Sequence, residues 1–338
     1  MNDCEVILRT DVSTTDQWHE VRITGLGGSD ASTVRGANHY KSRFELWAQK
    51  SGKIETTFEN EATKWGKRLE RTVAQAYAEE YNVAVYWWPV VLRNKGFSFL
   101  IATPDFFICN DPANAGTIVD WTHDEEPANI VSVLEIKTAG IASAGSTYGW
   151  DDDGVPLAYE LQGMHYCAVT GLRDVVFAAL VANQGLQVRF RTYEDDDVSE
   201  LVEEEFAFWE CVESGQEPAL EGTDSDFRAL RTMFPSPLEG KKTELTDEQV
   251  KIYHSWRDAK ALSEATAEVA AKNRAQLELI LADAEELTFE GTTLVTYKKT
   301  KGSIKVDTKA LAAEFPDVVK RFEVESPGYR VMRDKGKM

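Results

Sequence analysis

The sequence predicts an α/β fold, in which a central mixed β-sheet flanked by helices is followed by a long helix and a small α+β tail. Two observations predict it. Within residues 1–220, short apolar segments with the two-residue alternation of strands are interleaved with segments of helical periodicity. Beyond them, one long Ala-rich helical pattern precedes a lysine-rich end. We therefore expect a core over residues 1–220, a linker and long helical arm over residues 221–288, and a small basic tail over residues 289–338.

The composition is typical of a protein that folds in a reducing compartment. A chain of 338 residues is long enough to bury a sizeable core. Its four cysteines include no C-x-x-C pair, which argues against a structural zinc, an iron–sulfur cluster or a disulfide framework. The N-terminus lacks the apolar region of a signal peptide, and no apolar run approaches the length of a membrane span. We expect a soluble, cytoplasmic protein with no membrane partner.

The formal net charge of −20, from 57 acidic and 37 basic side chains, has the wrong sign for general binding to nucleic acid. Much of the excess lies in acidic runs such as 194–197 and 203–205, which we interpret as solvated faces. An acidic exterior is compatible with DNA binding only if basic side chains gather in one channel.

Residues 16–35 predict a short helix, a glycine-rich turn and a second helix that is capped by Ser29 or Asp30. Free main-chain N–H groups at such a helix start attract phosphate. The alternative is a plain capped turn, in which the glycines only supply unusual dihedral angles. Arg22, a few residues upstream, favours an anion site.

Two amphipathic helices follow. The first begins near Arg43 and carries Phe44 and Trp47, which we expect to pack in the core rather than stack on bases. The second, over residues 65–81, has a buried side at helical spacing, and Glu70 lies beside it among basic neighbours. Glu70 gains a chemical role only if this helix packs across a site that contains other carboxylates.

Two antiparallel strands are predicted over residues 83–92 and 97–108, joined by a turn at 93–96. The polar segment 110–129 predicts a loop insertion, and the Gly- and Ser-rich segment after Lys137 predicts a loop that borders the site. A further apolar strand lies between these two loops.

The rest of the predicted core begins with a helix near residue 157. Tyr159, Gln162 and Tyr166 share one face of this helix, because they are spaced by three and four residues. Two more strands and a closing helix are predicted at 174–181, 186–193 and 198–213.

In the C-terminal part, a capping box at Thr246 opens the long helix, and a hairpin follows it. The hairpin segment contains the densest basic patch in the chain, formed by Lys298, Lys299, Lys301 and Lys305. Contact with DNA and a plain solvated edge strand are both consistent with this patch.

The candidate site is built on Asp105, which follows a proline, and on the pair Glu135 and Lys137, which interrupts an apolar strand. Strand side chains repeat every two residues, so Glu135 and Lys137 share a face. Asp105 and Glu135 could hold a hard divalent cation, with the Ile136 carbonyl as a third ligand and Lys137 beside the attacking water. That combination suits phosphodiester hydrolysis. An ordinary buried ion pair is the alternative reading.

Four short motifs occur in one order: W-H-x-x-R with G-G-S-D, W-G-K-x-x-E, T-P-D with L-E-I-K, and Y-x-x-Q-x-x-x-Y. Together they resemble the YqaJ-type viral recombinase family, which includes lambda exonuclease, within the PD-(D/E)XK nuclease superfamily. The resemblance covers residues 16–210. It implies a restriction-endonuclease-like core with a central mixed sheet flanked by helices.

The resemblance also implies roles for individual residues. Asp105, Glu135 and the Ile136 carbonyl look like metal ligands, and Glu70 looks like the helix carboxylate near the metals. Lys137 looks like the group that activates or positions the water. Arg22 and Ser29 look like the residues that bind the 5′-terminal phosphate. Gln162 looks like the active-site glutamine, and Tyr159 and Tyr166 look like supporting tyrosines.

The implied activity is Mg²⁺-dependent hydrolysis of duplex DNA from a 5′ end, with Mn²⁺ as a substitute. It yields 5′-mononucleotides and leaves a 3′ single strand for an annealing protein. The family further implies a ring-shaped homo-oligomer, a trimer or tetramer, encoded by a phage or prophage and active in the bacterial cytoplasm. A structure-specific or single-strand nuclease of the same superfamily, and a non-catalytic scaffold that binds DNA ends, are the alternatives.

Overall fold

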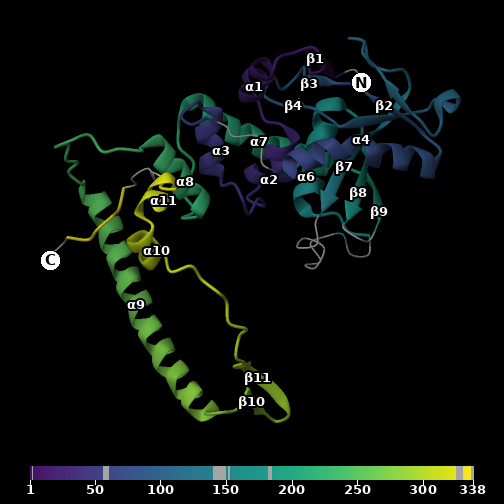
Figure 1. Cartoon of the computed structure of the whole chain (residues 1–338). Helices are drawn as coiled ribbons and strands as arrows, with labels where there is room; N and C mark the ends of the chain where they lie inside the picture. The colour runs from purple at the N-terminus through teal and green to yellow at the C-terminus, as the bar shows by residue number, and fades with distance from the viewer. Residues whose placement is uncertain are drawn as a thin grey trace. The chain divides into compact units, whose positions relative to one another are not determined.

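The computed structural model describes residues 1, 3–55, 61–139, 150, 153–181, 185–324 and 330–335. The chain divides into two compact units, Met1–Pro235 and Ser236–Met338 (Figure 1). The predicted loop bordering the site falls largely on residues 140–149, which lie outside the described residues. Among the described residues, no helix combines the length and the apolar character needed to cross a membrane.

A six-stranded mixed sheet forms the centre of the first unit, as predicted. The pairs β2–β6 and β7–β8 are parallel, and the other neighbours are antiparallel. In spatial order the strands are β6 (Ile118–Asp120), β2 (Ala84–Trp87), β5 (Phe106–Cys109), β7 (Ile130–Ala139), β8 (Asp174–Val181) and β9 (Leu186–Thr192).

A second, three-stranded sheet corrects the prediction for residues 83–108. It consists of β1 (Cys4–Arg9), β3 (Val90–Asn94) and β4 (Ile101–Ala102). Each predicted strand is broken in two, near Pro89 and Pro104, and its halves join different sheets. Proline has no N–H to donate to a strand ladder, so it marks the point where the chain leaves one sheet. The strand β1 was not predicted.

Seven helices of the first unit are described, and the predicted ones are all present. They are α1 (Thr15–Ile23), α2 (Gly28–Val34), α3 (Arg43–Lys50), α4 (Glu61–Tyr81), α6 (Leu157–Thr170), α7 (Asp195–Ser214) and α8 (Asp224–Met233). The predicted loop insertion at 110–129 contains a short 3₁₀ helix, η1 (Pro112–Asn114), and the strand β6. That loop prediction is therefore wrong in part, because three-residue β6 is too short to show an alternation.

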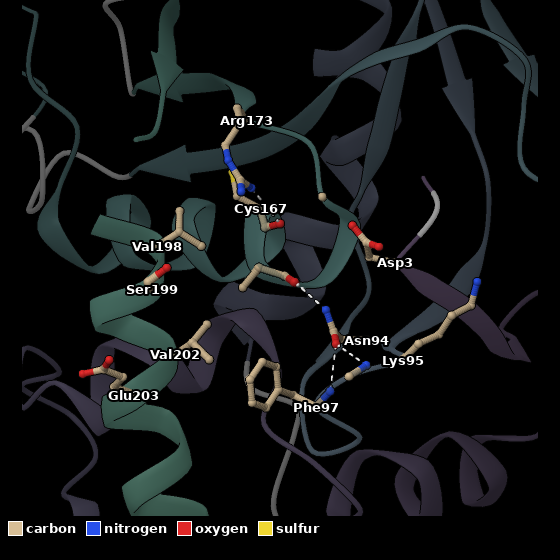
Figure 2. Close-up of a pocket in the computed structure, with 13 residues that line it drawn as sticks. Asp3, Asn94, Lys95, Phe97, Cys167, Arg173, Val198, Ser199, Val202 and Glu203 are labelled. Carbon is tan, nitrogen blue, oxygen red and sulfur yellow. Dashed lines mark hydrogen bonds between the residues drawn. The ribbon is translucent and has the colours of Figure 1, made fainter. Parts of the chain in front are cut away.

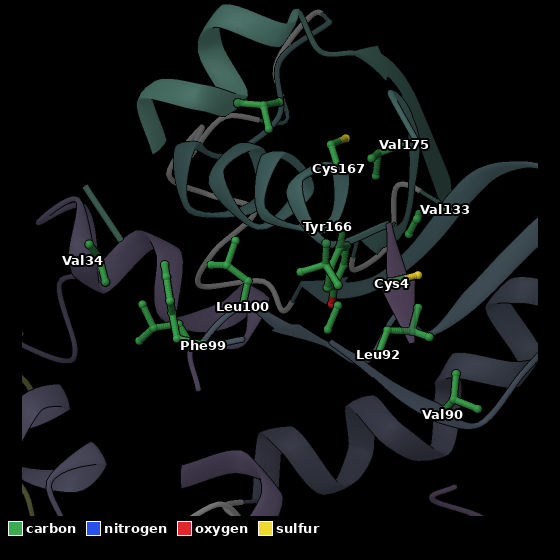
Figure 3. Close-up of a cluster of buried hydrophobic side chains, with 14 of the residues drawn as sticks. Cys4, Val34, Val90, Leu92, Phe99, Leu100, Val133, Tyr166, Cys167 and Val175 are labelled. Carbon is green, nitrogen blue, oxygen red and sulfur yellow. The ribbon is translucent and has the colours of Figure 1, made fainter. Parts of the chain in front are cut away.

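The helices α4 and α6 cover opposite faces of the central sheet. On one face, Tyr77 of α4 packs with Leu134 of β7. On the other, Tyr166 and Cys167 of α6 pack with Val133 (Figure 3). A strand buried on both faces is apolar on both sides. The two charged residues that interrupt β7 are therefore conspicuous.

One predicted solvated run is partly wrong, because Glu205 is completely buried. Its Oε1 lies 2.8 Å from Nδ1 of His165, and the other ring nitrogen lies 2.8 Å from the carbonyl of Ile101 in β4. Both ring nitrogens face acceptors, which favours the doubly protonated imidazolium. Burial lowers the pKa of His165, but the Glu205 carboxylate outweighs it, so the pKa is raised overall.

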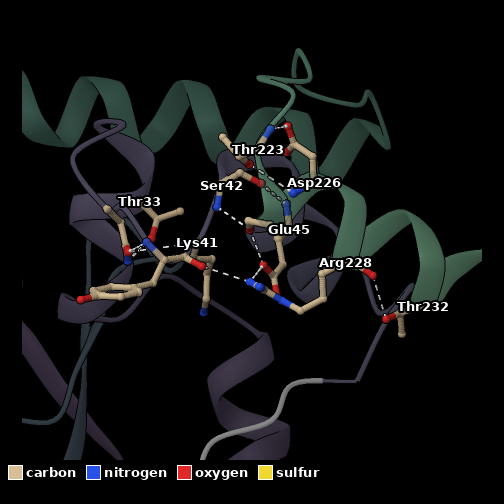
Figure 4. Close-up of polar contacts among 11 residues, drawn as sticks. Thr33, Lys41, Ser42, Glu45, Thr223, Asp226, Arg228 and Thr232 are labelled. Atoms are coloured by element: carbon tan, nitrogen blue, oxygen red, sulfur yellow. Dashed lines mark hydrogen bonds and ion pairs between the residues drawn. The ribbon is translucent and has the colours of Figure 1, made fainter. Parts of the chain in front are cut away.

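The boundary predicted at residue 220 is too early, because α8 belongs to the first unit. The main-chain N–H of Ser42 donates to Ser225 Oγ over 2.8 Å, and Ser225 Oγ donates to the carboxylate of Glu45 in α3. The guanidinium of Arg228 also contacts Glu45 (Figure 4). This polar contact holds α8 on α3, so the division falls after Pro235.

The second unit contains α9 (Asp247–Leu281), β10 (Glu286–Phe289), β11 (Thr292–Thr296), α10 (Thr308–Glu314) and α11 (Pro316–Arg321). The predicted capping box is present, with Thr246 and Gln249 bonded reciprocally over 3.1 and 3.3 Å. The two strands pair as the predicted hairpin. The predicted border between arm and tail at 288/289 falls inside β10 and is therefore wrong.

Candidate active site

The pair Glu135 and Lys137 lies at the centre of the site. Their side chains project from the same face of β7, as predicted, and Lys137 Nζ is 2.7 Å from Glu135 Oε1. Glu135 is only 3% exposed. Burial of such a pair is costly unless further polar contacts satisfy it. The surroundings of the pair therefore indicate its purpose.

Asp105 supplies the second carboxylate. It directly precedes β5, and its Oδ2 accepts the main-chain N–H of Ile136 over 2.9 Å. Burial raises the pKa of Asp105 well above its ordinary value, and the carboxylates of Glu135 and Glu70 raise it further. The Lys137 ammonium opposes this rise only in part, so the three carboxylates still concentrate negative charge here. A bound cation would stabilise the ionised form.

The helix α6 supports the pair with the predicted face. Gln162 Nε2 donates to Glu135 Oε1 over 2.6 Å and to the Tyr166 hydroxyl over 2.7 Å. The Gln162 oxygen accepts from Lys137 Nζ over 2.9 Å. The Tyr159 ring centroid lies 4.6 Å from the same ammonium. These contacts hold Glu135 and Lys137 in one orientation.

One atom of this network has no partner among the described residues. Glu135 Oε2 is buried and accepts no hydrogen bond from any of them. Leaving a buried carboxylate oxygen unsatisfied costs free energy, and such atoms call for an explanation. Together with the adjacent Asp105 carboxylate, this oxygen forms a hard donor set of the kind that suits Mg²⁺. The residues present therefore fit a divalent cation. The ligand role of the Ile136 carbonyl stays a prediction.

Glu70 lies on α4 and lines, with Asp105, a hollow of about 700 Å³. Burial raises the pKa of Glu70, and the charge of Glu135 adds to this effect. Within the described part of the chain, no three or more His, Cys, Asp or Glu side chains are arranged to hold one ion. Glu70 therefore contributes to the electrostatics of the site, and its direct contact with a metal stays a prediction.

Arg22 and Ser29 lie together beside the same hollow. Arg22 lines it, and its Nη2 donates to Ser29 Oγ over 3.3 Å. Trp18 also lines it, and the Arg22 guanidinium and Lys67 Nζ lie 5.1 and 5.8 Å from its ring centroid. The structure thus gathers basic groups and an aromatic ring in the same hollow as Glu70.

The predicted cap of α2 is wrong. The N-cap is Gly27, and neither Ser29 nor Asp30 occupies that position. Asp30 instead accepts the main-chain N–H of Gly27 over 3.0 Å from the third position of the helix. An acidic side chain at the third helical position can accept a hydrogen bond from the main-chain N–H of the N-cap residue, and so satisfies a donor at the start of the helix.

Lys50, which was not predicted as a site residue, contacts Asp30 at the start of α2. Its Nζ lies 2.8 Å from Asp30 Oδ2. A lysine at the end of an amphipathic helix is ordinarily solvated, and no signal in the sequence distinguishes this one.

A second hollow, of about 470 Å³, is lined by other residues, among them Asn94, Lys95, Cys167 and Arg173 (Figure 2). Burial raises the pKa of the Cys167 thiol to about 12, so it is not a nucleophile at neutral pH. Asn94 has a structural role, since its Nδ2 donates to the Ala168 carbonyl over 2.8 Å. Of the predicted site residues, Arg22, Glu70 and Asp105 line the first hollow instead.

Comparison with known proteins agrees with the motifs. Residues 17–173 match the model of the YqaJ-like viral recombinase domain. The chain is 28% identical to protein YqaJ of Bacillus subtilis (strain 168) over 329 residues, which cover 95% of each chain. A shorter match, 39% identical over 57 residues, joins 17% of this chain to 16% of protein D345L of African swine fever virus (strain Badajoz 1971 Vero-adapted).

Among solved structures, the alkaline exonuclease LHK-Exo from Laribacter hongkongensis matches with a TM-score of 0.45 and 18% identity, covering 60% of this chain and 94% of the exonuclease. A phage-related exonuclease from Haemophilus somnus 129PT matches with a TM-score of 0.39 and 10% identity, covering 59% of this chain and 100% of that chain. The family predicted from the motifs is confirmed by the sequence matches. Through residues 17–173, the chain is similar to the YqaJ-like viral recombinase domain, and over most of its length it is similar to protein YqaJ.

Proposed function

We propose that this protein is a metal-dependent 5′-to-3′ DNA exonuclease, which degrades one strand of a duplex end to 5′-mononucleotides. The observation that carries the proposal is Glu135 Oε2, which is buried near the Asp105 carboxylate and has no hydrogen-bond partner in the described part of the chain. A folded protein retains such a costly arrangement when a ligand completes it. A divalent cation on a phosphodiester is the ligand that two adjacent carboxylates and an ammonium suit best.

The cation would be Mg²⁺, with Mn²⁺ as a substitute, held by Asp105, Glu135 and the Ile136 carbonyl, with Glu70 nearby. When bound, it neutralises charge on the scissile phosphate and lowers the pKa of a bound water. The donor set favours these metals because carboxylate and carbonyl oxygens are hard ligands.

The chain's own residues orient the reaction. Burial lowers the pKa of Lys137, but the carboxylates of Glu135 and Asp105 outweigh it, so the pKa is raised. Lys137 is therefore an ammonium that donates hydrogen bonds, and its role is to position the water and stabilise developing charge. Gln162 holds both Lys137 and Glu135, and so limits the freedom of the two groups that flank the reacting phosphate.

The 5′ polarity of the proposal depends on Arg22 and Ser29. A terminal phosphate carries more negative charge than one within the chain, so a guanidinium and a hydroxyl beside the hollow favour an end over an internal phosphodiester. Because the same hollow is lined by Asp105 and Glu70, a terminal nucleotide held by Arg22 lies next to the carboxylates. This supports removal of one nucleotide at a time from that end.

The proposal extends to the partners that the family resemblance implies. The substrates are double-stranded DNA ends, and the product is a 3′ single strand for an annealing protein. The working form is a homo-oligomeric ring of three or four copies. The setting is the bacterial cytoplasm, with the gene carried by a phage or prophage.

The test is digestion of a linear duplex that has one 5′-phosphate and one 5′-hydroxyl end, each with its own label. We expect mononucleotides from the phosphorylated end in Mg²⁺ and none in EDTA. Lys137→Ala should lower the rate about 10²- to 10³-fold, as loss of one charge-stabilising donor does. Arg22→Ala should weaken the preference between the ends. Lys64→Ala, an exposed lysine of α4, is the matched control and should leave both unchanged.

Other outcomes would favour one of the alternative functions. Equal digestion of both ends, or cleavage of a closed circular duplex, would retain a nuclease and remove the exonuclease assignment. Wild-type protein that cleaves neither strand with Mg²⁺ or Mn²⁺ would favour the non-catalytic scaffold that binds DNA ends.

A further inference from the structure

The segment from Arg22 to Asp30, here called the end-binding loop, comprises the end of α1, the connection over residues 24–27 and the start of α2, and it contains both Arg22 and Ser29. It contacts the strands through its middle: the N–H of Leu26 donates to the Phe99 carbonyl over 2.6 Å. A Cβ at Gly25 would lie 2.4 Å from that same carbonyl oxygen, so only glycine permits this approach. The middle of the loop is therefore closely packed, and other contacts must hold Arg22 and Asp30 at its two ends.

Lys50, the last residue of α3, supplies that support. Its Nζ donates to the Arg22 carbonyl over 2.9 Å and to the Gly25 carbonyl over 2.7 Å, and it lies 2.8 Å from Asp30 Oδ2. An ammonium has three donors, and all three are used. The side chain is only 7% exposed, so these contacts are shielded from solvent. Lys50 thus connects the beginning, the middle and the end of the end-binding loop.

The charges of this cluster explain why a lysine is needed there. The Asp30 carboxylate is buried and lies 3.9 Å from Arg22 Nη2 as well as 2.8 Å from Lys50. Burial raises the pKa of Asp30, but Lys50, Arg22 and Lys41 outweigh it, so the pKa is lowered and the group is an anion. Burial also lowers the pKa of Lys50, an effect that Asp30 opposes.

Two cations, Arg22 and Lys50, thus share one carboxylate. Without Lys50, the Asp30 carboxylate would offset the charge of Arg22 more fully and so weaken its attraction for a phosphate. With Lys50, the loop keeps one unit of positive charge, and Arg22 remains directed toward Ser29 and the hollow.

We propose that Lys50 is a positioning residue that neutralises Asp30 and so allows Arg22 to select a terminal 5′-phosphate. The inference rests on the proposed function, because it assigns the end-binding loop to the terminal phosphate. Lys50 acts through Arg22 and Asp30, since its ammonium is saturated by the loop and does not face the hollow.

The test measures binding of the full chain in EDTA, where no cleavage occurs, to two hairpin duplexes that differ only in a 5′-phosphate or a 5′-hydroxyl. Wild type should bind the phosphorylated end about tenfold more tightly, as expected for one charged hydrogen bond. Lys50→Met, which keeps the length of the side chain, should lose this ratio. Lys53→Met removes an exposed lysine near the same helix end and should retain it.

The decisive variant is the double substitution Lys50→Met with Asp30→Asn. It restores one unit of positive charge to the loop, so the phosphate preference should return toward the wild-type ratio. A purely structural role predicts the opposite, because the double variant removes two buried contacts rather than one. If thermal melting shows that Lys50→Met is not folded, Asp30→Asn alone should raise the ratio above wild type, since the Asp30 carboxylate then no longer offsets the charge of Arg22 and Lys50.

The inference is overturned if folded Lys50→Met keeps the wild-type ratio, if the double variant is no better than the single one, or if wild type binds both ends equally. Failure of the proposed function is a separate result. Protein that discriminates the two ends in EDTA but cleaves neither in Mg²⁺ would contradict the exonuclease and support the role of Lys50.

Discussion

Two lysine–glutamate pairs, one in each unit, have similar distances and differ in burial. Lys137 and Glu135 lie 2.7 Å apart within a sheet that is covered by helices on both faces. Lys298, just after β11, lies 3.0 Å from Glu286 of β10, and both side chains are exposed. An exposed pair is screened by water and contributes little, whereas a buried pair has strong effects on its neighbours.

The comparison shows that burial, rather than the presence of charge, creates the candidate site. On the hairpin, Glu286 Oε2 accepts from the Thr293 hydroxyl over 3.2 Å, and the exposed pair is open to solvent. Around β7, Glu135 Oε2 is buried without a donor among the described residues, and Asp105 and Glu70 have raised pKa values because burial and like charges disfavour their ionised forms. Of the two pairs, the buried one therefore suits the proposed cation.

Neutralising Glu135 or Glu286 should give the largest difference between the two pairs, measured as the rate of DNA digestion. Glu135→Gln removes a charge while keeping the shape of the side chain, and we expect a loss of Mg²⁺-dependent DNA digestion of about 10²- to 10³-fold. Glu286→Gln is the matched change on the hairpin and should leave the rate unchanged. The measurement is the release of mononucleotides at several Mg²⁺ concentrations. Equal effects of the two substitutions would contradict the distinction.

Truncation of an apolar side chain should also destabilise the protein more near Glu135 than on the β10–β11 hairpin. Leu134→Ala opens a cavity in the sheet core, where Leu134 is fully buried, and should lower the free energy of unfolding by about 2–5 kcal/mol. Leu294→Ala in β11 removes a side chain that is 65% exposed and should change it by less than about 0.5 kcal/mol. Urea unfolding followed by circular dichroism measures both. A large effect of Leu294→Ala would show that the hairpin contributes to a core.

The smallest expected effect is a dependence of stability on pH through His165. Its folded-state pKa is raised above the ordinary value of about 6.5, so its contribution is fully present below that pH and is lost as the pH rises through the folded-state pKa. For one proton the slope is at most about 1.4 kcal/mol per pH unit. His165→Gln should remove this component from urea unfolding above pH 6.5.

The control for this experiment is His254→Gln, which removes an exposed imidazole from α9 in the second unit. Its unfolding should follow the wild-type pH profile. A His165→Gln profile that still declines above pH 6.5 as steeply as wild type would assign the slope to another group. His165→Gln should also be the less stable variant, because it leaves the Glu205 carboxylate buried without its partner.

Much of the fold followed from local patterns. The strands β8 and β9 and the start of α9 lie where the sequence predicted them, because an apolar alternation or a capping box involves only neighbouring residues. The exchange of strands between two sheets near Pro89 and Pro104 was missed, since the pairing partner of a strand is chosen by residues far away in the chain.

The same division holds for the site. Asp105, Glu135, Lys137 and Gln162 were predicted, because charged or polar residues stand out at positions where the pattern requires apolar ones. Lys50 and Glu205 were not, because each has many equivalents on the surface of the chain. Their burial becomes visible only when α3 and α7 are packed in place.

The sequence by itself therefore determined the elements, the face that Glu135 shares with Lys137, and the family that the chain resembles. Only the tertiary structure decided that Glu135 Oε2 has no partner among the described residues, that Lys50 reaches three acceptors in one loop, and that α8 belongs to the first unit. The physical reason is range. Periodicity and capping act over a few residues, whereas burial and charge compensation depend on contacts between segments that the chain itself keeps far apart.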